Sequence, residues 1–337
     1  MTLDNASVND VFVDMLKIQL NLNNALYSDG EFFHVRCCAH ILNSIVQEGL
    51  KEIDEPIFKV CESIKYVRGS QVRKQKFLEC VRQVSLESKK DLRQDVPTRW
   101  NSTFLMLESA LFYHHAFLHL KLNYSNYKHC PSEEEWGKVE KISKLLSVFY
   151  DATLVFSGAK YPTSNLYFSQ VFLIEFTLRQ KMQSAYAFIQ RMTRQIYEKF
   201  EKYWSDHSLI LAMAVILDPR YKFQFVEYCY KKLNRYGSTE SMHIRDYMFS
   251  LFNQYMLASS KTPTTSTSTH GDMETATSSE TSEACRKADA FKDFDTFESF
   301  DFVTMAQKSQ LELYLDEPRV DRKSNLDVLY FWKVNQF

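Results

Sequence analysis

The chain has 337 residues, of which 45% are hydrophobic and 15% aromatic, so it can bury a large core and hold one large domain or two. Its formal net charge is −1, which excludes an argument for nucleic-acid binding from bulk charge alone. Only 7 glycines and 7 prolines leave few tight turns, and this favours long helices over a fold of many short strands.

Cysteine usage and apolar run lengths indicate the compartment. The seven cysteines are odd in number and include no C-x-x-C pair, which argues against a disulfide framework and favours a reducing environment. The first residues do not resemble a signal peptide, and the longest apolar run, 209–217, is too short to span a bilayer. We therefore expect a nuclear or cytoplasmic protein that does not enter a membrane.

Apolar residues recur at helical spacing along most of the chain. A strand is expected close to the N-terminus, followed by a helix over about 10–22. Further helices are expected at about 37–53, 58–66, 72–87, 99–122, 133–157, 163–204, 208–217, 221–234, 242–257, 307–315 and 326–334. Ser132 and Glu135 form a capping-box pattern at the start of one of these helices.

The segment 259–285 differs from its surroundings. It is rich in Ser and Thr and nearly free of large apolar residues, which predicts a disordered linker. Beyond it, five phenylalanines between Phe291 and Phe302 alternate with acidic residues. The sequence therefore predicts a helical region, an unstructured tether, and a short C-terminal segment that is acidic and aromatic.

Charge is unevenly distributed along the chain. Between Lys65 and Arg99 there are ten Lys or Arg residues against four Asp or Glu, whereas between Asp289 and Asp327 there are ten acidic residues against five basic ones. Solvated helix faces and loops are the ordinary explanation for both runs. A surface that follows a nucleic-acid backbone is the functional alternative for the basic run.

Several strings occur in an order that resembles the hAT-type DNA transposases, especially their domesticated plant sleeper relatives. They are Asp4–Asp10, Arg36–Asn43, Asp95–Ser102, Tyr161–Leu166, Met213–Lys222, Leu311–Pro318 and Leu326–Lys333. The resemblance implies a mostly α fold, in which the helical insertion domain of an RNase-H-like transposase accompanies a small remnant of the catalytic α/β sheet. It also implies four parts, namely the RNase-H-like remnant (1–45), the helical insertion (46–258), the linker (259–285), and the start of a C-terminal dimerisation region (286–337).

The resemblance also bears on catalysis. Transposases of this class hold two divalent metals with three carboxylates, and Asp4 matches the second of these acids. The other two would lie outside this chain, so we expect truncation at both ends, no BED-type zinc finger, and no enzymatic activity. We likewise expect no bound metal, no cofactor and no small-molecule substrate. A turn or helix-cap role is the alternative for Asp4.

Cys37 and His40 form a C-x-x-H pair that allows three interpretations. The pair is at best half of a zinc site, because no second pair follows at suitable spacing. The residues can also be a core cysteine and a histidine at a helix start. The resemblance implies a third role beside DNA, in which Arg36 and His40 contact phosphate through charge-assisted hydrogen bonds.

Trp100 follows the basic run within a distinctive string, Thr98–Ser102. It can anchor the start of a long helix that Asn101 or Ser102 caps. The resemblance instead places it near the DNA end, where an unpaired base would stack on the indole. The expected DNA contacts are therefore Arg36, Cys37, His40, Arg73, Lys74, Lys76, Arg82, Lys89, Lys90, Arg93, Arg99 and Trp100.

The main functional hypothesis is a catalytically incomplete, nuclear DNA-binding protein that contacts DNA through its backbone and by stacking. The alternative is a protein-interaction module that forms a homodimer, or a heterodimer with intact hAT-like proteins, through its C-terminal segment. A decayed transposase fragment remains a third interpretation. Salt-sensitive retention on DNA distinguishes the first hypothesis from salt-insensitive association, which would disappear on deleting 286–337.

Overall fold

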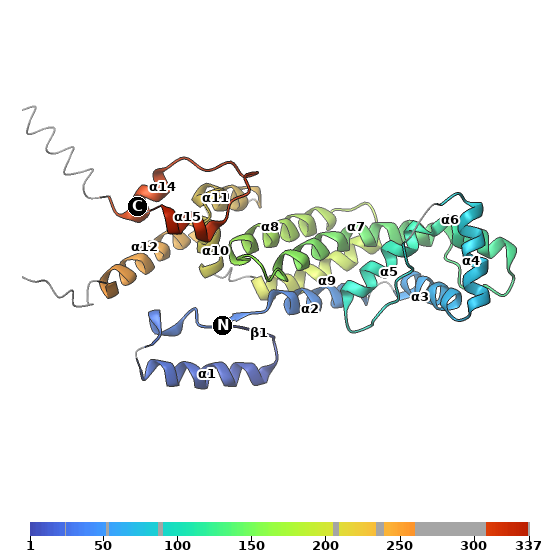
Figure 1. Ribbon diagram of the computed structural model, residues 1–337, viewed down its shortest axis with the longest axis horizontal. Helices are drawn as coiled ribbons and strands as arrows, with labels where there is room; N and C mark the ends of the chain where they lie inside the picture. The colour runs from blue at the N-terminus through green and yellow to red at the C-terminus, as the bar shows by residue number, and fades with distance from the viewer. Residues whose placement is uncertain are drawn as a thin grey trace, which may run out of the picture.

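The computed structural model describes residues 1–23, 25–51, 54–86, 90–204, 209–233, 239–259 and 308–335. Within these ranges the elements are β1 (Thr2–Leu3), α1 (Ser7–Asn21), the 3-10 helix η1 (Tyr27–Gly30), β2 (Val35–Arg36), α2 (Cys38–Leu50), α3 (Asp54–Arg68), α4 (Gln71–Gln83), α5 (Trp100–Phe112), α6 (His114–Asn123), α7 (Glu133–Phe156), α8 (Ser164–Lys181), α9 (Ala187–Trp204), α10 (Leu209–Ile216), α11 (Lys222–Lys232), α12 (Thr239–Ser259), α14 (Gln310–Asp316) and α15 (Val328–Val334). The expected fold, mostly α with a small α/β part, is confirmed. Figure 1 shows an elongated body with α4 and α6 at one end and the strands, α1 and the C-terminal helices at the other.

The two strands form a parallel pair in which Thr2 faces Val35 and Leu3 faces Arg36. Parallel strands require a crossover connection, and α1 lies in it. The inner side of α1 buries Val13, whereas Val8 on its outer side is 75% exposed. A strand and a helix therefore form here, as expected, although the helix begins a turn earlier than its apolar spacing indicates.

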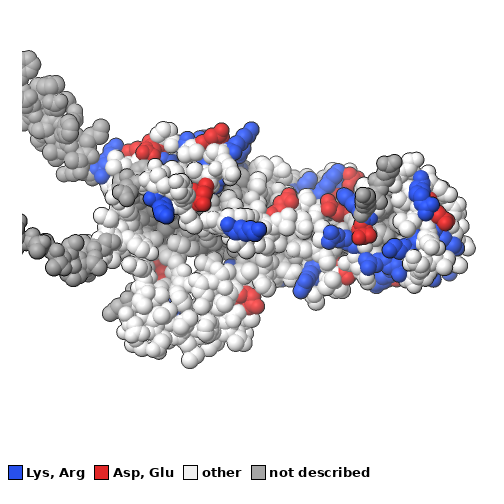
Figure 2. All heavy atoms as spheres, viewed as in Figure 1, with Lys and Arg blue, Asp and Glu red and all other residues white. Residues whose placement is uncertain are grey.

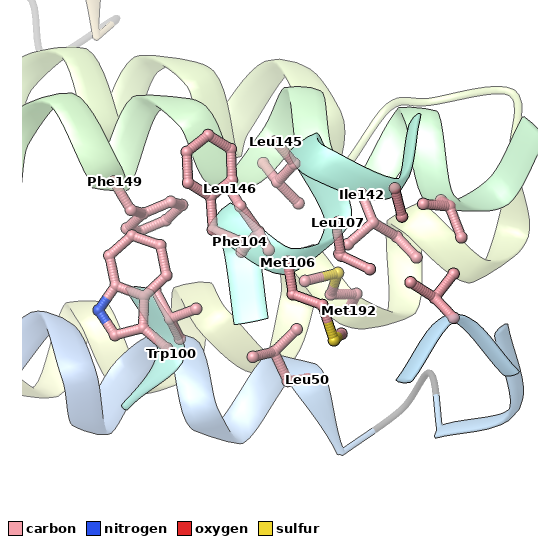
Figure 3. Packing of buried hydrophobic residues seen from close by; sticks show 14 of the residues in the cluster. Leu50, Trp100, Phe104, Met106, Leu107, Ile142, Leu145, Leu146, Phe149 and Met192 are labelled. Carbon is pink, nitrogen blue, oxygen red and sulfur yellow. The ribbon is translucent and has the colours of Figure 1, made fainter. Parts of the chain in front are cut away.

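The main hydrophobic core is built from the helices α2 through α9. Its buried residues come from helices far apart in sequence, and Figure 3 shows side chains of α2, α5, α7 and α9 meeting in one layer. Leu42 of α2 and Leu146 of α7 are fully buried. Gly49 allows α9 to approach closely, since a Cβ there would lie 2.6 Å from Cδ1 of Ile196. This core holds the long body of the molecule together.

A second hydrophobic cluster lies at the end that carries the chain termini. It joins α10, α11, α12 and α14 to Phe168 of α8. Leu311 and Tyr314 of α14 are 6% and 1% exposed, and the Trp332 indole donates a hydrogen bond to the Leu217 carbonyl oxygen at 2.8 Å. The strings at 311–318 and 326–333 therefore bury part of their apolar surface within this chain.

Two of the expected long helices are each divided in two. The helix expected over 99–122 bends at Tyr113, whose hydroxyl donates a hydrogen bond to the Lys90 carbonyl oxygen. The helix expected over 163–204 is interrupted near Ser184, whose hydroxyl oxygen accepts the Tyr186 amide. Apolar spacing continues across both bends, so spacing alone does not reveal them.

Helix ends with local signals agree better with the expectation. Ser132 Oγ accepts the Glu135 amide at 3.3 Å, and Glu135 Oε2 accepts the Ser132 amide at 2.7 Å, which confirms the capping box. In contrast, α4 ends at Gln83, four residues before its expected end, and Ser85 beyond it adopts a left-handed φ of 53°.

Some of the expectations concern residues outside the described ranges. These are Lys89, the linker from 260 to 285, and the phenylalanine-rich segment from Phe291 to Phe302. Among the helices that the structure describes, none has both the length and the apolar character needed to cross a membrane.

Candidate nucleic-acid interface

Basic side chains gather on α4 and on the loop that leads into α5. The N-cap residue of α4 is Ser70, whose Oγ accepts the Arg73 amide at 3.2 Å, and the helix buries Phe77, Cys80 and Val81 against its neighbours. Its remaining faces carry Arg73, Lys74, Lys76 and Arg82, and the loop adds Lys90, Arg93 and Arg99. We call these seven residues the basic face. Figure 2 shows Lys and Arg side chains concentrated over this end of the molecule.

Most cations of the basic face have no carboxylate partner among the residues that the structure describes. On α7, by comparison, Lys138 and Lys144 form salt bridges to acids four residues earlier, at 2.7 and 2.6 Å. Within the described residues no salt bridge holds Arg73, Lys74, Lys76, Arg82, Arg93 or Arg99. Their charge is therefore available to an external anion.

Three cations of the basic face are held in place by aromatic rings. The Arg73 guanidinium carbon lies 4.4 Å from the Tyr66 ring centroid. The Nζ atoms of Lys76 and Lys90 lie 4.4 Å from the Tyr124 ring centroid and 5.0 Å from the Phe112 ring centroid, respectively. Such contacts orient a cation without neutralising it.

The loop from residue 90 to 99 is fixed to the helical body by hydrogen bonds. Arg68 Nη1 donates to the Leu92 carbonyl oxygen at 3.0 Å, and the Arg93 amide donates to Ser109 Oγ at 3.0 Å. Asp95 Oδ1 accepts hydroxyl groups of α5 at 2.8 and 3.0 Å. The loop cations are therefore presented by an anchored backbone.

Sequence reasoning missed Arg68 as a site residue. This exposed arginine ends α3 and lines a surface hollow of about 730 Å³ together with Lys90 and Arg93. The hollow also contains the acids Asp91 and Glu108. The count of basic residues between 65 and 99 included Arg68, but the sequence alone does not show that the end of α3 meets the loop.

Trp100 occupies a different position from the one that the stacking hypothesis requires. Its side chain is 1% exposed and lies beside Phe149, with the ring centroids 6.4 Å apart (Figure 3). Its amide donates to Asn43 Oδ1 at 3.3 Å, which ties the start of α5 to α2. The stacking role is therefore corrected: Trp100 is a core anchor, and a base has no exposed indole face on which to stack.

The C-x-x-H string lies at the start of α2, well away from α4 (Figure 1). Arg36 is half exposed and forms a salt bridge of 3.5 Å with Asp10. Cys37 is the N-cap residue of α2, and His40 is exposed one turn later. The structure thus does not bring Arg36, Cys37 and His40 together with the basic face.

Cys38 lies within this string, between Cys37 and His40. Burial raises its pKa to about 12, so that its thiol stays protonated at neutral pH. In the part of the chain that the structure describes, no three His, Cys, Asp or Glu residues are grouped so that they could hold a metal ion.

Asp4 lies directly after β1 and fixes the turn into α1. Its Oδ1 atom accepts the Ala6 amide at 3.0 Å and the Asn9 side-chain amide at 2.5 Å. These bonds are those of a turn or helix-cap aspartate, the alternative that the sequence left open. They do not test whether Asp4 also belonged to a catalytic set.

Two family models match parts of this chain. Residues 35–145 match the family described as the ZBED1 RNase-like helical domain, and residues 165–255 match the hAT-like transposase, RNase-H fold. These ranges contain the basic face and most of the two hydrophobic clusters.

Similar curated proteins include several from plants. RICESLEEPER 2, a zinc finger BED domain-containing protein of Oryza sativa subsp. japonica, is 36% identical over 99% of this chain and 47% of its own length. A putative AC transposase of Zea mays is 34% identical over 99% of this chain and 41% of its own length. DAYSLEEPER, a zinc finger BED domain-containing protein of Arabidopsis thaliana, is 30% identical over 96% of this chain and 44% of its own length. The chain therefore spans about half the length or less of these relatives, and it belongs to the hAT family of transposase-derived proteins.

Proposed function

We propose that this chain binds duplex DNA through the basic face and does not cut it. The observation that carries the proposal is the set of exposed cations on α4 and the following loop that have no carboxylate partner among the described residues. Cations that neutralise phosphates release counterions, which drives binding independently of sequence. The word transposase in the name of the maize relative supports DNA as the ligand.

The expected binding mode is contact with the phosphate backbone. Arg73, Lys76 and Lys90 are oriented by rings, and the loop carrying Arg93 is anchored to α5, so the charges are preorganised. Phosphate contacts position a protein on DNA but do not read base sequence. We therefore expect little sequence preference from this part of the protein.

The proposal that the chain lacks nuclease activity rests on the chemistry of two-metal catalysis. Such a site requires several carboxylate oxygens around two cations. Asp4 is engaged in a turn, and in the described residues no group of three His, Cys, Asp or Glu side chains could hold a metal ion. The proposal extends to a nuclear location, which DNA binding would require. Incubation with supercoiled plasmid in magnesium or manganese buffer tests the proposed lack of nuclease activity. Cleavage that Asp4→Asn abolishes would contradict it.

Pairing with a second copy of this chain is the second candidate. It is supported by α15, on which Leu329 and Tyr330 are 67% and 65% exposed although neighbouring residues of the same helix pack inward. Light scattering of the wild type and of Leu329→Glu/Tyr330→Glu tests this candidate. A dimer that the double variant converts to a monomer supports pairing, and a wild type that is monomeric at all concentrations excludes it.

Charge reversal tests the DNA-binding proposal directly. Lys74 and Arg82 are exposed and lie two turns apart on α4, so Lys74→Glu/Arg82→Glu changes the charge without altering the core. We expect duplex affinity to fall about tenfold or more at moderate salt. The matched control is Lys160→Glu/Lys202→Glu, which makes the same charge change at exposed lysines outside the basic face. An equal fall in affinity for both variants would contradict the proposal.

A further inference from the structure

A second basic and aromatic surface lies at the end of the molecule opposite the basic face. A hollow of about 620 Å³ opens between α11 and the loop that joins α14 to α15. Tyr221 and Tyr228 line it from the α11 side, and Arg319 and Arg322 line it from the loop. We call it the α11 hollow. Figure 1 shows α11 beside α14 and α15, far from α4.

The walls of the α11 hollow are held together by bonds between distant parts of the chain. The Val320 amide donates to the Pro219 carbonyl oxygen at 3.0 Å, which joins the loop to the turn before α11. The Lys222 ammonium donates to the Glu317 carbonyl oxygen at 2.8 Å. Asp321 Oδ1 accepts the Lys323 amide at 2.9 Å and so shapes the loop itself. The hollow is thus a built feature of the fold.

The arginines of the hollow have different roles. Arg220 is bound by buried Asp218, with Nε to Oδ1 at 2.9 Å and Nη2 to Oδ2 at 2.6 Å, so its charge is already satisfied. Arg319 and Arg322 are exposed, and among the described residues neither forms a salt bridge. Among the residues that line the hollow, Asp321 is the acidic one, so the two arginines leave an excess of positive charge there.

The aromatic wall of the hollow offers an accessible ring. Tyr228 is 50% exposed, with the Lys232 ammonium 5.9 Å from its ring centroid. Tyr221 and Phe225 pack beside it with their ring centroids 4.8 Å apart. An exposed ring next to arginines without a salt bridge is the combination that binds an unpaired base and its flanking phosphates. Trp100, which is buried, cannot provide such a surface.

We infer that the α11 hollow binds single-stranded DNA, with an unpaired base stacked on Tyr228 and adjacent phosphates contacted by Arg319 and Arg322. Duplex DNA suits it poorly, because bases within a duplex already stack on each other. A site of this kind lies apart from the basic face and does not depend on duplex binding there. It gives the string Met213–Lys222, which supplies part of its wall, a ligand-binding role.

The test uses a fluorescent oligothymidylate and measures its anisotropy on titration with the full chain. All proteins carry Lys74→Glu/Arg82→Glu, so that binding at the basic face contributes little. We expect Tyr228→Ala to weaken oligothymidylate binding about tenfold, and Tyr228→Phe, which keeps the ring, to change it less than about twofold. Arg319→Gln/Arg322→Gln should weaken binding and reduce its salt dependence.

The matched control is Tyr186→Ala. Tyr186 is also 50% exposed and also faces a lysine, with Lys141 Nζ 4.4 Å from its ring centroid, but it lies outside the hollow. The Tyr186→Ala substitution should leave the affinity for oligothymidylate unchanged. Two results would overturn the inference. One is that Tyr228→Ala binds oligothymidylate as tightly as the Lys74→Glu/Arg82→Glu protein from which it is made, and the other is that this starting protein does not bind oligothymidylate. Failure of duplex binding at the basic face would not affect it, since the two ligands and two sets of variants are separate.

Discussion

Lys222 donates a hydrogen bond to the carbonyl oxygen of Glu317 at 2.8 Å, joining residues 95 positions apart in the chain. The same ammonium group donates to the Tyr314 carbonyl oxygen and lies over the Tyr314 ring. It thereby satisfies carbonyl groups at the C-terminal end of α14, where a helix leaves them without partners. Lys222, itself 1% exposed with a left-handed φ of 51°, attaches the C-terminal segment to the helical body.

Replacing Lys222 with Met should therefore release the C-terminal segment. Loss of the charged hydrogen bonds should lower the free energy of unfolding by about 1.5–3 kcal/mol and speed proteolysis between α12 and α15. Limited proteolysis followed by mass spectrometry measures the release. Lys323→Met, at an exposed lysine of the same segment, is the control. Identical cleavage of both variants would show that Lys222 does not hold α14.

Two glycine substitutions, one where helices α2 and α9 approach closely and one on α7, should have opposite effects on stability. Gly49→Ala should destabilise the protein by about 1–3 kcal/mol, because the new Cβ would overlap Ile196. Gly137→Ala, on α7, has space, since the nearest atom to its Cβ is Lys141 Nζ at 3.8 Å. It should stabilise the helix by up to about 1 kcal/mol. Urea unfolding measures both, and equal effects would contradict the helix packing described.

His114 should make the protein sensitive to acid. Burial lowers its pKa below 6.5, an effect that Glu133 opposes and His115 reinforces. Between the lowered pKa and 6.5 the unfolded chain binds more protons than the folded one, so the free energy of unfolding falls as pH drops through this window. In His114→Phe, which keeps a ring beside Trp136, this contribution should disappear. Urea unfolding at about pH 7.5 and about pH 5 tests it, and an unchanged acid-induced destabilisation would contradict it.

Trp100 should matter for stability and not for contact with DNA. Trp100→Ala should lower the free energy of unfolding by about 3–5 kcal/mol, because it leaves a cavity beside Phe149. Leu122→Ala, at a side chain that is 83% exposed, should change it by less than about 0.5 kcal/mol. Trp100→Phe should retain the affinity of the folded protein for duplex and single-stranded DNA. A selective loss of single-strand affinity in a stable Trp100→Phe variant would restore the stacking role.

The accuracy of the sequence-based predictions depended on whether each signal was local. The capping box at Ser132 was predicted because both of its partners lie within four residues. The bend at Tyr113 was not predicted, because nothing in the neighbouring residues signals it and the hydroxyl of Tyr113 bonds to Lys90, 23 positions away. Both halves of the interrupted helix keep their apolar spacing, so the pattern that predicted the helix also concealed its break.

The same distinction applies to the candidate site. The excess of Lys and Arg between 65 and 99 was visible in the sequence, and the structure gathers most of it at one end of the molecule. The sequence did not show that Trp100 points into the core, because a tryptophan at a helix start can face either way. Nor did it show that Arg36 and His40 lie away from α4, since this depends on how α2 and α3 extend the body.

The central claim is that duplex DNA binds through the charges of the basic face, and the salt dependence of affinity tests it most directly. The slope of log K against log salt concentration should be steep for the wild type and shallower by about 1.8 for Lys74→Glu/Arg82→Glu, which is about 0.9 for each phosphate that the variant no longer neutralises. Lys160→Glu/Lys202→Glu should keep the wild-type slope. A wild-type affinity that does not change with salt, or identical slopes in all three proteins, would contradict the account.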